Sequence, residues 1–185
     1  MKKTIFFLIL FVSNITYGQL LTVTQSGLKD VNENDKSYVV IQVKDKSAKE
    51  LYNQSINYIN KFYKNPDVVI KGKIDGEYLR FNTYARSITT MKNVIARTYI
   101  DAKYTTELSF KDGKIKFEII DIQLLVEGRN PIYFVGSGIS SFYIFNTKGK
   151  LERADAKSGI EAYFNGKILE LSMYLESLEK AEEEW

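Results

Sequence analysis

The most constraining feature of this 185-residue sequence is a pair of Asp-Gly dipeptides, each between two runs of alternating apolar and polar residues. Asp75-Gly76 lies within VVIKGKIDGEYLRFNT, and Asp112-Gly113 lies within YTTELSFKDGKIKFEI. Asp-Gly favours the positive φ angles of a type I′ turn, whose twist matches that of two antiparallel strands. Each dipeptide therefore predicts a two-residue hairpin, and the two hairpins together predict an antiparallel sheet.

The turn at Asp112-Gly113 also sets the register of its two strands, because a two-residue loop fixes how they pair. Apolar residues then face one another on the side of the hairpin that is expected to face the core. The alternation slips near Ile119-Ile120, which predicts a β-bulge or a strand end there. The expected inward pairs are Phe110 with Ile115, Leu108 with Phe117, and Thr106 with Ile119.

A strand followed by a helix is predicted over residues 37–66. Residues 38–43, YVVIQV, alternate and have strong β propensity. Ser47 stands three residues before Glu50, which is the spacing of a capping box at a helix N-terminus. Apolar residues then recur at helical spacing, and Asn65-Pro66 ends the predicted helix.

The last third of the chain predicts more β structure and a final helix. Residues 130–149, NPIYFVGSGISSFYIFNTKG, are apolar and β-prone, and their Gly-Ser-Gly break predicts either a hairpin or a loop that covers the sheet. Residues 158–184 keep one apolar face at helical spacing, and Ser158 and Glu161 repeat the capping-box spacing. Because glycine costs ~1 kcal/mol against alanine inside a helix, Asn165-Gly166 predicts a kink or a short first helix.

Residues 1–18 have the pattern of a secretory signal peptide, with two lysines, an apolar core from Ile5 to Val12 and small residues before Gln19. An uncleaved anchor is the alternative, but the apolar core is much shorter than the ~20 residues that span a bilayer. Cleavage leaves 24 basic and 23 acidic residues, a balance that gives no support for a nucleic-acid partner. No second long apolar run is present, so we expect no membrane span after cleavage.

Three segments are expected after the signal peptide: a flexible leader at 19–36, one domain at 37–180 and a frayed acidic tail at 181–185. Part of the leader, Leu20 to Val23, is a candidate edge strand. Each predicted helix has one apolar stripe and each strand one apolar face, so the helices should cover the sheet. We therefore predict an α+β fold: an antiparallel meander sheet with two helices on one face, in the order β-α-β4-α.

Some of these features resemble a known family. They are Leu51-Tyr52 in the first helix, YKNP at 63–66 and the two Asp-Gly hairpins. Over residues 36–150 the chain resembles the DUF4468 family, exported Bacteroidetes domains of unknown function described as having a TATA-binding-protein-like (TBP-like) fold. The resemblance implies the same β-α-β4-α topology. It implies no reaction, and no site residue is carried over from it.

Composition narrows the chemistry, because the chain contains no histidine and no cysteine. This excludes disulfides, Ser-His-Asp and Cys-His catalytic arrangements, histidine general bases and the usual zinc sites. Hydrolysis by paired carboxylates, a Ser-Lys pair or oxygen-ligated calcium stays compatible with the composition. We expect no cofactor and assign no catalytic or metal-binding residue.

The outward face of the second hairpin supplies the first candidate binding residues. Glu107 and Glu118 should stand opposite each other, where like charges destabilise a sheet. They are either a calcium-binding or acid–base couple, or two solvated glutamates relieved by Lys103 and Lys116. The second interpretation is preferred, because neither glutamate lies in a predicted cleft.

Tyrosines supply the second set of candidates. Tyr58 and Tyr78 are candidate contacts to another envelope protein or a glycan, and Tyr99 and Tyr143 are further residues that could face outward. Packing in the core or at a sheet edge is the preferred interpretation for all four, because aromatic residues fit pleated, half-buried surfaces.

Two short motifs are assigned to structure or chance. Gly136-Ser137-Gly138 resembles the start of a phosphate loop but lacks the lysine and the following helix, so a turn between strands is preferred. Ser26 and Lys29 have Ser-x-x-Lys spacing but lie in the predicted leader.

We therefore expect an exported, non-enzymatic binding or structural module of the cell envelope, periplasmic or extracellular. The alternatives are a carboxylate-dependent hydrolase and a small-ligand carrier with a pocket between helix and sheet. A deep pocket with converging carboxylates would favour the enzyme. A shallow apolar patch on the sheet face would favour the module.

Overall fold

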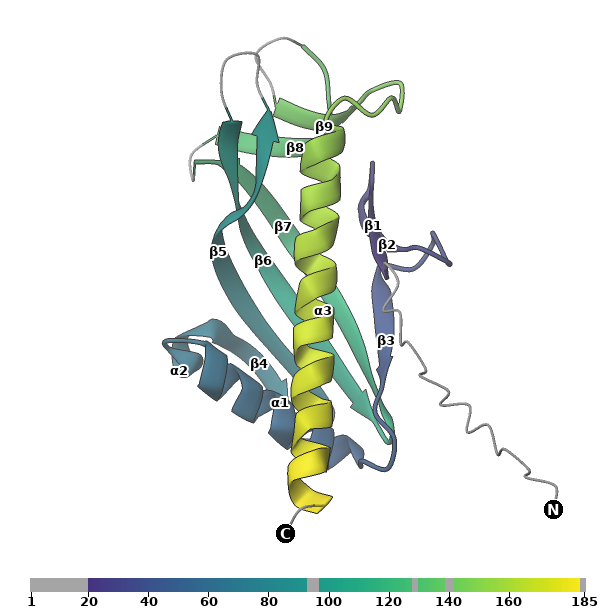
Figure 1. Cartoon of the computed structure of the whole chain (residues 1–185), viewed down its shortest axis with the longest axis vertical. Helices are drawn as coiled ribbons and strands as arrows, with labels where there is room; N and C mark the ends of the chain where they lie inside the picture. The colour runs from purple at the N-terminus through teal and green to yellow at the C-terminus, as the bar shows by residue number, and fades with distance from the viewer. Residues whose placement is uncertain (1–19, 93–96, 128–129, 139–141, 184–185) are drawn as a thin grey trace, which may run out of the picture.

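A computed structural model describes residues 20–92, 97–127, 130–138 and 142–183, so the predicted signal peptide lies outside the described residues. In this part of the chain, seven strands form one sheet, and a two-stranded hairpin and three helices complete the fold (Figure 1). The strands of the main sheet are β3 (Tyr38–Gln42), β4 (Ile70–Ile74), β5 (Tyr78–Lys92), β6 (Arg97–Lys111), β7 (Lys114–Val126), β8 (Asn130–Gly136) and β9 (Phe142–Asn146).

The main sheet is a meander in which β4 to β8 pair antiparallel in chain order. β3 pairs antiparallel with the first part of β7, and β8 pairs with its last part. β9 departs from the wholly antiparallel prediction, because it runs parallel to β8. The Gly-Ser-Gly segment therefore does not form the hairpin turn that was one of its two predicted alternatives.

The register predicted for the Asp112-Gly113 hairpin is confirmed, and so is a bulge beyond it. Asp121 and Ile122 on β7 stand opposite Tyr104 alone on β6. This extra residue shifts the inward side from odd to even positions, which explains the slip in the sequence pattern two residues earlier. The confirmed pairs are Phe110 with Ile115, Leu108 with Phe117, and Thr106 with Ile119.

Helix α1 (Ala48–Phe62) begins at the predicted capping box. The hydroxyl of Ser47 accepts from the backbone N–H of Glu50, and the Glu50 carboxylate accepts from the backbone N–H of Ser47 at 2.7 Å. Both interactions satisfy donors that have no partner within the helix. A one-turn helix, α2 (Pro66–Val69), follows and leads the chain to the sheet edge at β4.

Helix α3 (Ala154–Glu183) begins four residues before the predicted start and continues through Asn165-Gly166. It also extends through the first part of the predicted frayed tail. Gly159 lies where the helix approaches β5, and a β-carbon there would overlap the side chain of Thr89. Glycine is thus required for this close packing. In the described part of the chain, no helix is long and apolar enough to cross a membrane.

The predicted flexible leader instead contains an ordered hairpin of β1 (Leu21–Thr24) and β2 (Gly27–Asp30). Leu21, Val23 and Leu28 are buried in the core, so the segment is part of the domain. β1 pairs with β2 rather than with the edge of the main sheet. The strand predicted at 20–23 is thus present one residue later, at Leu21–Thr24, but in a separate two-stranded sheet.

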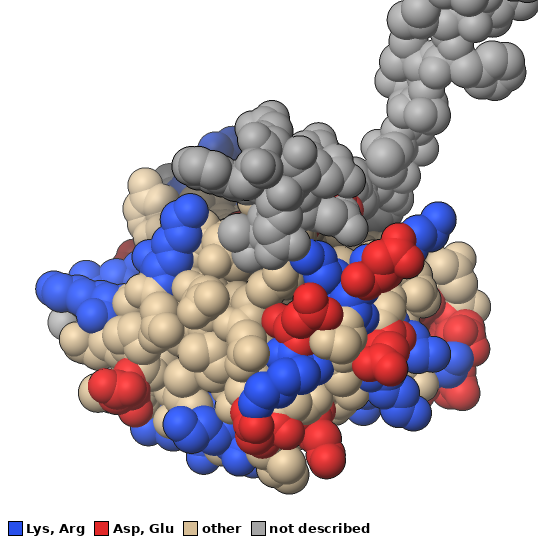
Figure 2. Space-filling view, turned by 90° about the horizontal axis from the view of Figure 1, so that it is seen from below, with Lys and Arg blue, Asp and Glu red and all other residues tan. Residues whose placement is uncertain are grey.

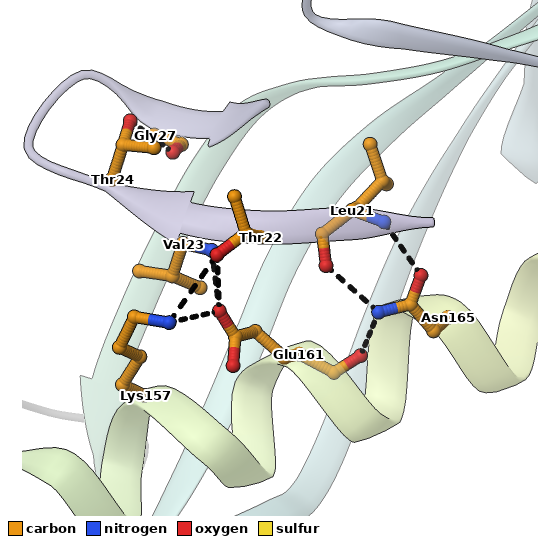
Figure 3. Close-up of polar contacts among 8 residues, drawn as sticks. All are labelled: Leu21, Thr22, Val23, Thr24, Gly27, Lys157, Glu161 and Asn165. Carbon is orange, nitrogen blue, oxygen red and sulfur yellow. Dashed lines mark hydrogen bonds and ion pairs between the residues drawn. The ribbon is translucent and has the colours of Figure 1, made fainter. Parts of the chain in front are cut away.

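Asn165 on α3 holds this hairpin by its backbone (Figure 3). Its Oδ1 accepts from the N–H groups of Leu20 and Leu21 at 3.0 and 2.8 Å, and its Nδ2 donates to the Leu21 carbonyl at 2.9 Å. An asparagine that predicted an interruption of the helix thus attaches the N-terminal hairpin to α3.

Glu161 makes the second attachment, one helical turn earlier (Figure 3). Its Oε1 accepts from the Thr22 hydroxyl at 2.7 Å and the Val23 N–H at 2.8 Å, and it pairs with Lys157. Burial works against its ionisation, but these bonds outweigh burial and hold the pKa of Glu161 below its ordinary value. The predicted capping box of Ser158 and Glu161 is therefore wrong, because both residues lie inside the helix.

α1 and α3 pack on the same face of the sheet, as predicted. α1 buries Leu51 and Ile59 against β6 and β7, and α3 buries Ile160, Phe164 and further residues of the same stripe against β5 and β1. Strand residues from the inward pairs complete this core. The largest fully buried side chains are Phe164, Leu21, Leu51, Ile59, Leu79, Met91, Ile100, Leu108, Ile115, Leu124, Ile144 and Ile160.

Candidate functional site: the open face of the sheet

The face of the sheet opposite the two helices is polar and open, and the strands bring most of the predicted site residues together there. The side chains of Lys103, Glu107 and Lys116 are exposed or half-buried on this face, with Glu118 and Tyr78 beside them. Charges of both signs are also interspersed at the lower end of the molecule (Figure 2). The molecule therefore shows no single-sign surface in this view.

Glu107 and Glu118 pair directly across β6 and β7, as predicted. Glu107 accepts from the Tyr78 hydroxyl at 2.6 Å, and its Oε1 lies 3.7 Å from Nε of Arg80. Burial and the bond to Glu107 raise the pKa of Tyr78 to about 12, so this hydroxyl stays protonated at neutral pH. Arg80 and Tyr78 thus offset the negative charge of Glu107. The prediction gave this role to Lys103.

Lys116 offsets the charge of Glu118, as predicted. Its Nζ lies 2.7 Å from Oε2 of Glu118. The Ser37 hydroxyl donates to the other oxygen, and Lys116 also lies 4.4 Å from the centre of the Tyr38 ring. Burial opposes ionisation, but the bonds from Lys116 and Ser37 outweigh it and lower the pKa of Glu118. Glu118 is therefore ionised at neutral pH and unsuited to donating a proton.

Tyr58 does not belong to this surface, because it packs in the core, as the preferred interpretation expected, and it is no longer a candidate outward contact. The residue is buried between α1 and α3, where its hydroxyl donates to Glu170 at 2.8 Å and its ring contacts Tyr174. Helical spacing placed it on the apolar stripe, and the hydrogen bond satisfies its one polar group. Of the other tyrosines, Tyr99 is exposed and Tyr143 is half-buried.

A hollow of about 980 Å³ lies on the open face beside the bulge in β7. Asp121 has a positive φ of 54° there, and its carboxylate contacts Arg80 at 3.1 Å. Bulges re-aim side chains in this way and are common next to functional sites. The polar and basic residues that line the hollow are Lys71, Arg80, Asn82, Thr83, Tyr84, Lys103, Thr105, Asp121 and Gln123.

The exposed ring of Tyr84 stands at this hollow and is fixed by a buried carboxylate. Its hydroxyl donates to Asp101 at 2.9 Å, and Asp101 also accepts from the backbone N–H of Ser87 at 2.7 Å. The bond to Asp101, with burial, raises the pKa of Tyr84. Lys103 Nζ lies 5.5 Å from the ring centre. The ring is thus held in one orientation beside a cation.

The basic residues of the hollow differ in how their charge is balanced. Within the described residues, neither Lys71 nor Lys103 forms an ion pair, although Arg80 pairs with Asp121 and Glu107. The arrangement is therefore suited to holding a polar ligand with negative charge. No group of three or more acidic residues in the described part is placed to bind a metal ion.

Sequence reasoning found Lys103 but missed Arg80, Tyr84, Asp101 and Asp121. The slip of alternation before Asp121 was the available signal, since it marks the bulge that turns this carboxylate outward. Tyr84 and Asp101 meet only through the pairing of β5 with β6, which local sequence does not specify.

The two short motifs have structural roles in the described residues. Gly136 ends β8, and no helix follows directly. Ser26 contacts the hydroxyl of Thr24 in the β1–β2 turn, and Lys29 lies on β2. The structure thus leaves both assignments unchanged: a turn for Gly136-Ser137-Gly138, and chance spacing for Ser26 and Lys29.

Comparison with known proteins finds similarity in structure alone. No family model matches the sequence, and no curated protein matches it. A DUF4468 family protein from Bacteroides ovatus shares the fold, with a TM-score of 0.50 and 13% identity over 75% of this chain and 83% of that one. A TBP-like protein from Parabacteroides distasonis aligns with a TM-score of 0.42 and 12% identity over 75% and 90% of the two chains. The likeness to the Bacteroides ovatus protein confirms the predicted fold and agrees with the resemblance to the DUF4468 family at the level of structure, and it names no activity.

Proposed function

We propose that this protein is an exported binding module of the cell envelope and that the hollow on its open face binds an acidic glycan. The observation that carries the proposal is the exposed Tyr84 ring, fixed by Asp101 and placed beside Lys103, whose charge has no carboxylate partner in the described residues. Aromatic rings offer flat apolar faces to sugar rings, and cations attract their carboxylates.

Neighbouring side chains support a polar ligand. The amides of Asn82 and Gln123 are exposed at the hollow and offer both donors and acceptors to hydroxyl groups. Orienting polar groups around an apolar contact are typical of small-molecule sites.

A hydrolase is the less favoured alternative, because the carboxylates of this face are neutralised by neighbours. Glu118 has a lowered pKa, whereas a catalytic acid at neutral pH needs a raised one. In a binding site, Glu107 would instead hold Arg80 in place, and Glu118 would hold Lys116.

The test is affinity electrophoresis of the protein in gels that contain polygalacturonate, an acidic polysaccharide, or dextran, a neutral one. Polygalacturonate should retard the protein, and Lys103→Gln and Tyr84→Ala should each remove most of the retardation. Lys148→Gln, which removes an exposed lysine outside the hollow, is the matched control.

Equal retardation by dextran, or full retardation of the Lys103→Gln and Tyr84→Ala variants, would refute the glycan site. New reducing ends in the polygalacturonate, absent with Glu107→Gln, would favour the hydrolase instead. Export is tested separately by N-terminal sequencing of the envelope fraction. We expect Gln19 as the first residue, and a cytoplasmic product that retains Met1 would contradict export.

A further inference from the structure

β3 presents a free edge in the described part of the chain, because it pairs with β7 on one side only. Val43, just after the strand, donates its N–H to the Gly113 carbonyl at 2.9 Å, so odd-numbered residues here bond toward β7. The backbone N–H and C=O groups of Val40 and Gln42 therefore point the other way. An edge with unpaired backbone groups is a template for a further strand.

A groove of about 570 Å³ lies beside this edge, between β3 and α3. Its walls are largely apolar and include Ile41, Ala162 and Leu169. Gly166 leaves additional space, since nothing lies within 4 Å of where its β-carbon would stand. The groove is thus open to side chains from a strand placed along β3.

The α3 side of the groove is continuous with the residues that hold β1. Glu161 and Asn165 bind the backbone of β1, and both also line the groove. Ser172 and Glu176 lie 11 residues farther along, which is three helical turns, and line the same groove. The Ser172 hydroxyl donates to the Glu176 carboxylate at 3.4 Å, so α3 lines the groove with polar groups on the same side on which it binds β1.

The opposite side of the β3 edge is basic. A second hollow, of about 360 Å³, is lined by Val40 and by Lys111, Lys114 and Lys116. Lys116 pairs with Glu118, but Lys111 and Lys114 form no ion pair within the described residues. Alternate side chains of a strand added at this edge would point into the apolar groove and toward these lysines.

We propose that the β3 edge binds an extended segment of a partner protein that alternates apolar and acidic residues, as an eighth strand of the sheet. Charge selects this occupant. A second copy paired through β3 would bring Lys111 and Lys114 toward the same lysines. Residues 1–19 contain two lysines and no carboxylate, so they do not match either. The inference does not rest on the glycan site.

The probe is a short fluorescent peptide that alternates valine and glutamate, with a valine–lysine peptide as control. Fluorescence anisotropy should show binding of the glutamate peptide at least tenfold tighter than that of the lysine peptide. Hydrogen exchange should slow at the amides of Val40 and Gln42, because their N–H groups enter the new ladder. Protection elsewhere, with none at these two amides, would overturn the proposal.

Two variants separate the groove from the charge. Gly166→Leu should fill the groove and weaken peptide binding at least tenfold while keeping the helix, and Lys114→Glu should weaken it by charge. Lys103→Gln, in the hollow beside the β7 bulge, should leave peptide binding unchanged. Failure of the glycan proposal is therefore distinguishable from failure of this one. Unaltered binding by Gly166→Leu would overturn the proposal. A dimer in sedimentation that Gly166→Leu abolishes would replace the partner by a second copy.

Discussion

Removing the side chain of Asn165 should loosen the N-terminal hairpin and lower the free energy of unfolding. Asn165→Ala deletes three hydrogen bonds to the backbone of Leu20 and Leu21. At ~0.5–1.5 kcal/mol for each bond, the loss is about 1.5–4.5 kcal/mol. Alanine's better helix propensity returns up to ~0.7 kcal/mol, so the net cost should be about 1–4 kcal/mol.

The assay is denaturant unfolding of Asn165→Ala beside Asn57→Ala. Asn57 is an exposed helical asparagine, and its side chain makes no hydrogen bond among the described residues, so it reports the propensity term alone. Hydrogen exchange should also quicken at Leu20 and Leu21 in the first variant. If the two variants unfold within ~0.5 kcal/mol of each other, the attachment of β1 to α3 contributes no stability and the reasoning is wrong.

Three further changes test the packing and the charges. Gly159→Ala should destabilise the protein in denaturant because its β-carbon would overlap Thr89, whereas Gly166→Ala should stabilise it by ~1 kcal/mol; equal effects would contradict the close approach of α3 to β5. Ile59→Ala should cost ~2–5 kcal/mol in the same assay, and a near-neutral result would place the apolar stripe of α1 away from the sheet. Because the pKa of Glu161 is lowered on folding, its contribution is complete above the ordinary value of 4.5 and is lost as the pH falls through the folded pKa. The free energy of unfolding should therefore drop in acid, and less so in Glu161→Gln; identical pH profiles would show that Glu161 is not the group responsible.

Local chemistry determined what the sequence could predict. The Asp112-Gly113 turn specified a register that holds over the whole first half of the hairpin, because a two-residue loop and one apolar face leave no other pairing. The capping box of Ser47 and Glu50 likewise set the start of α1, since both bonds are made within four residues.

Contacts between distant segments explain what the sequence did not predict. Ser158 and Glu161 have the spacing of a capping box, yet Glu161 bonds to β1, 138 residues away. The segment at 19–36 was predicted to be flexible because its two short strands carry few apolar residues. The strands are instead held in place by side chains of α3. The same holds for the candidate site, where Tyr84 meets Asp101 across two strands.

The attachment of β1 to α3 also has a consequence for the order of events during synthesis. Asn165 and Leu21 are 144 positions apart, so the ribosome releases the hairpin first and the helix that holds it last. A two-stranded hairpin is at best marginally stable alone, and contacts so distant in sequence form late. The β1–β2 hairpin therefore gains its place in the fold only when the final helix docks against it.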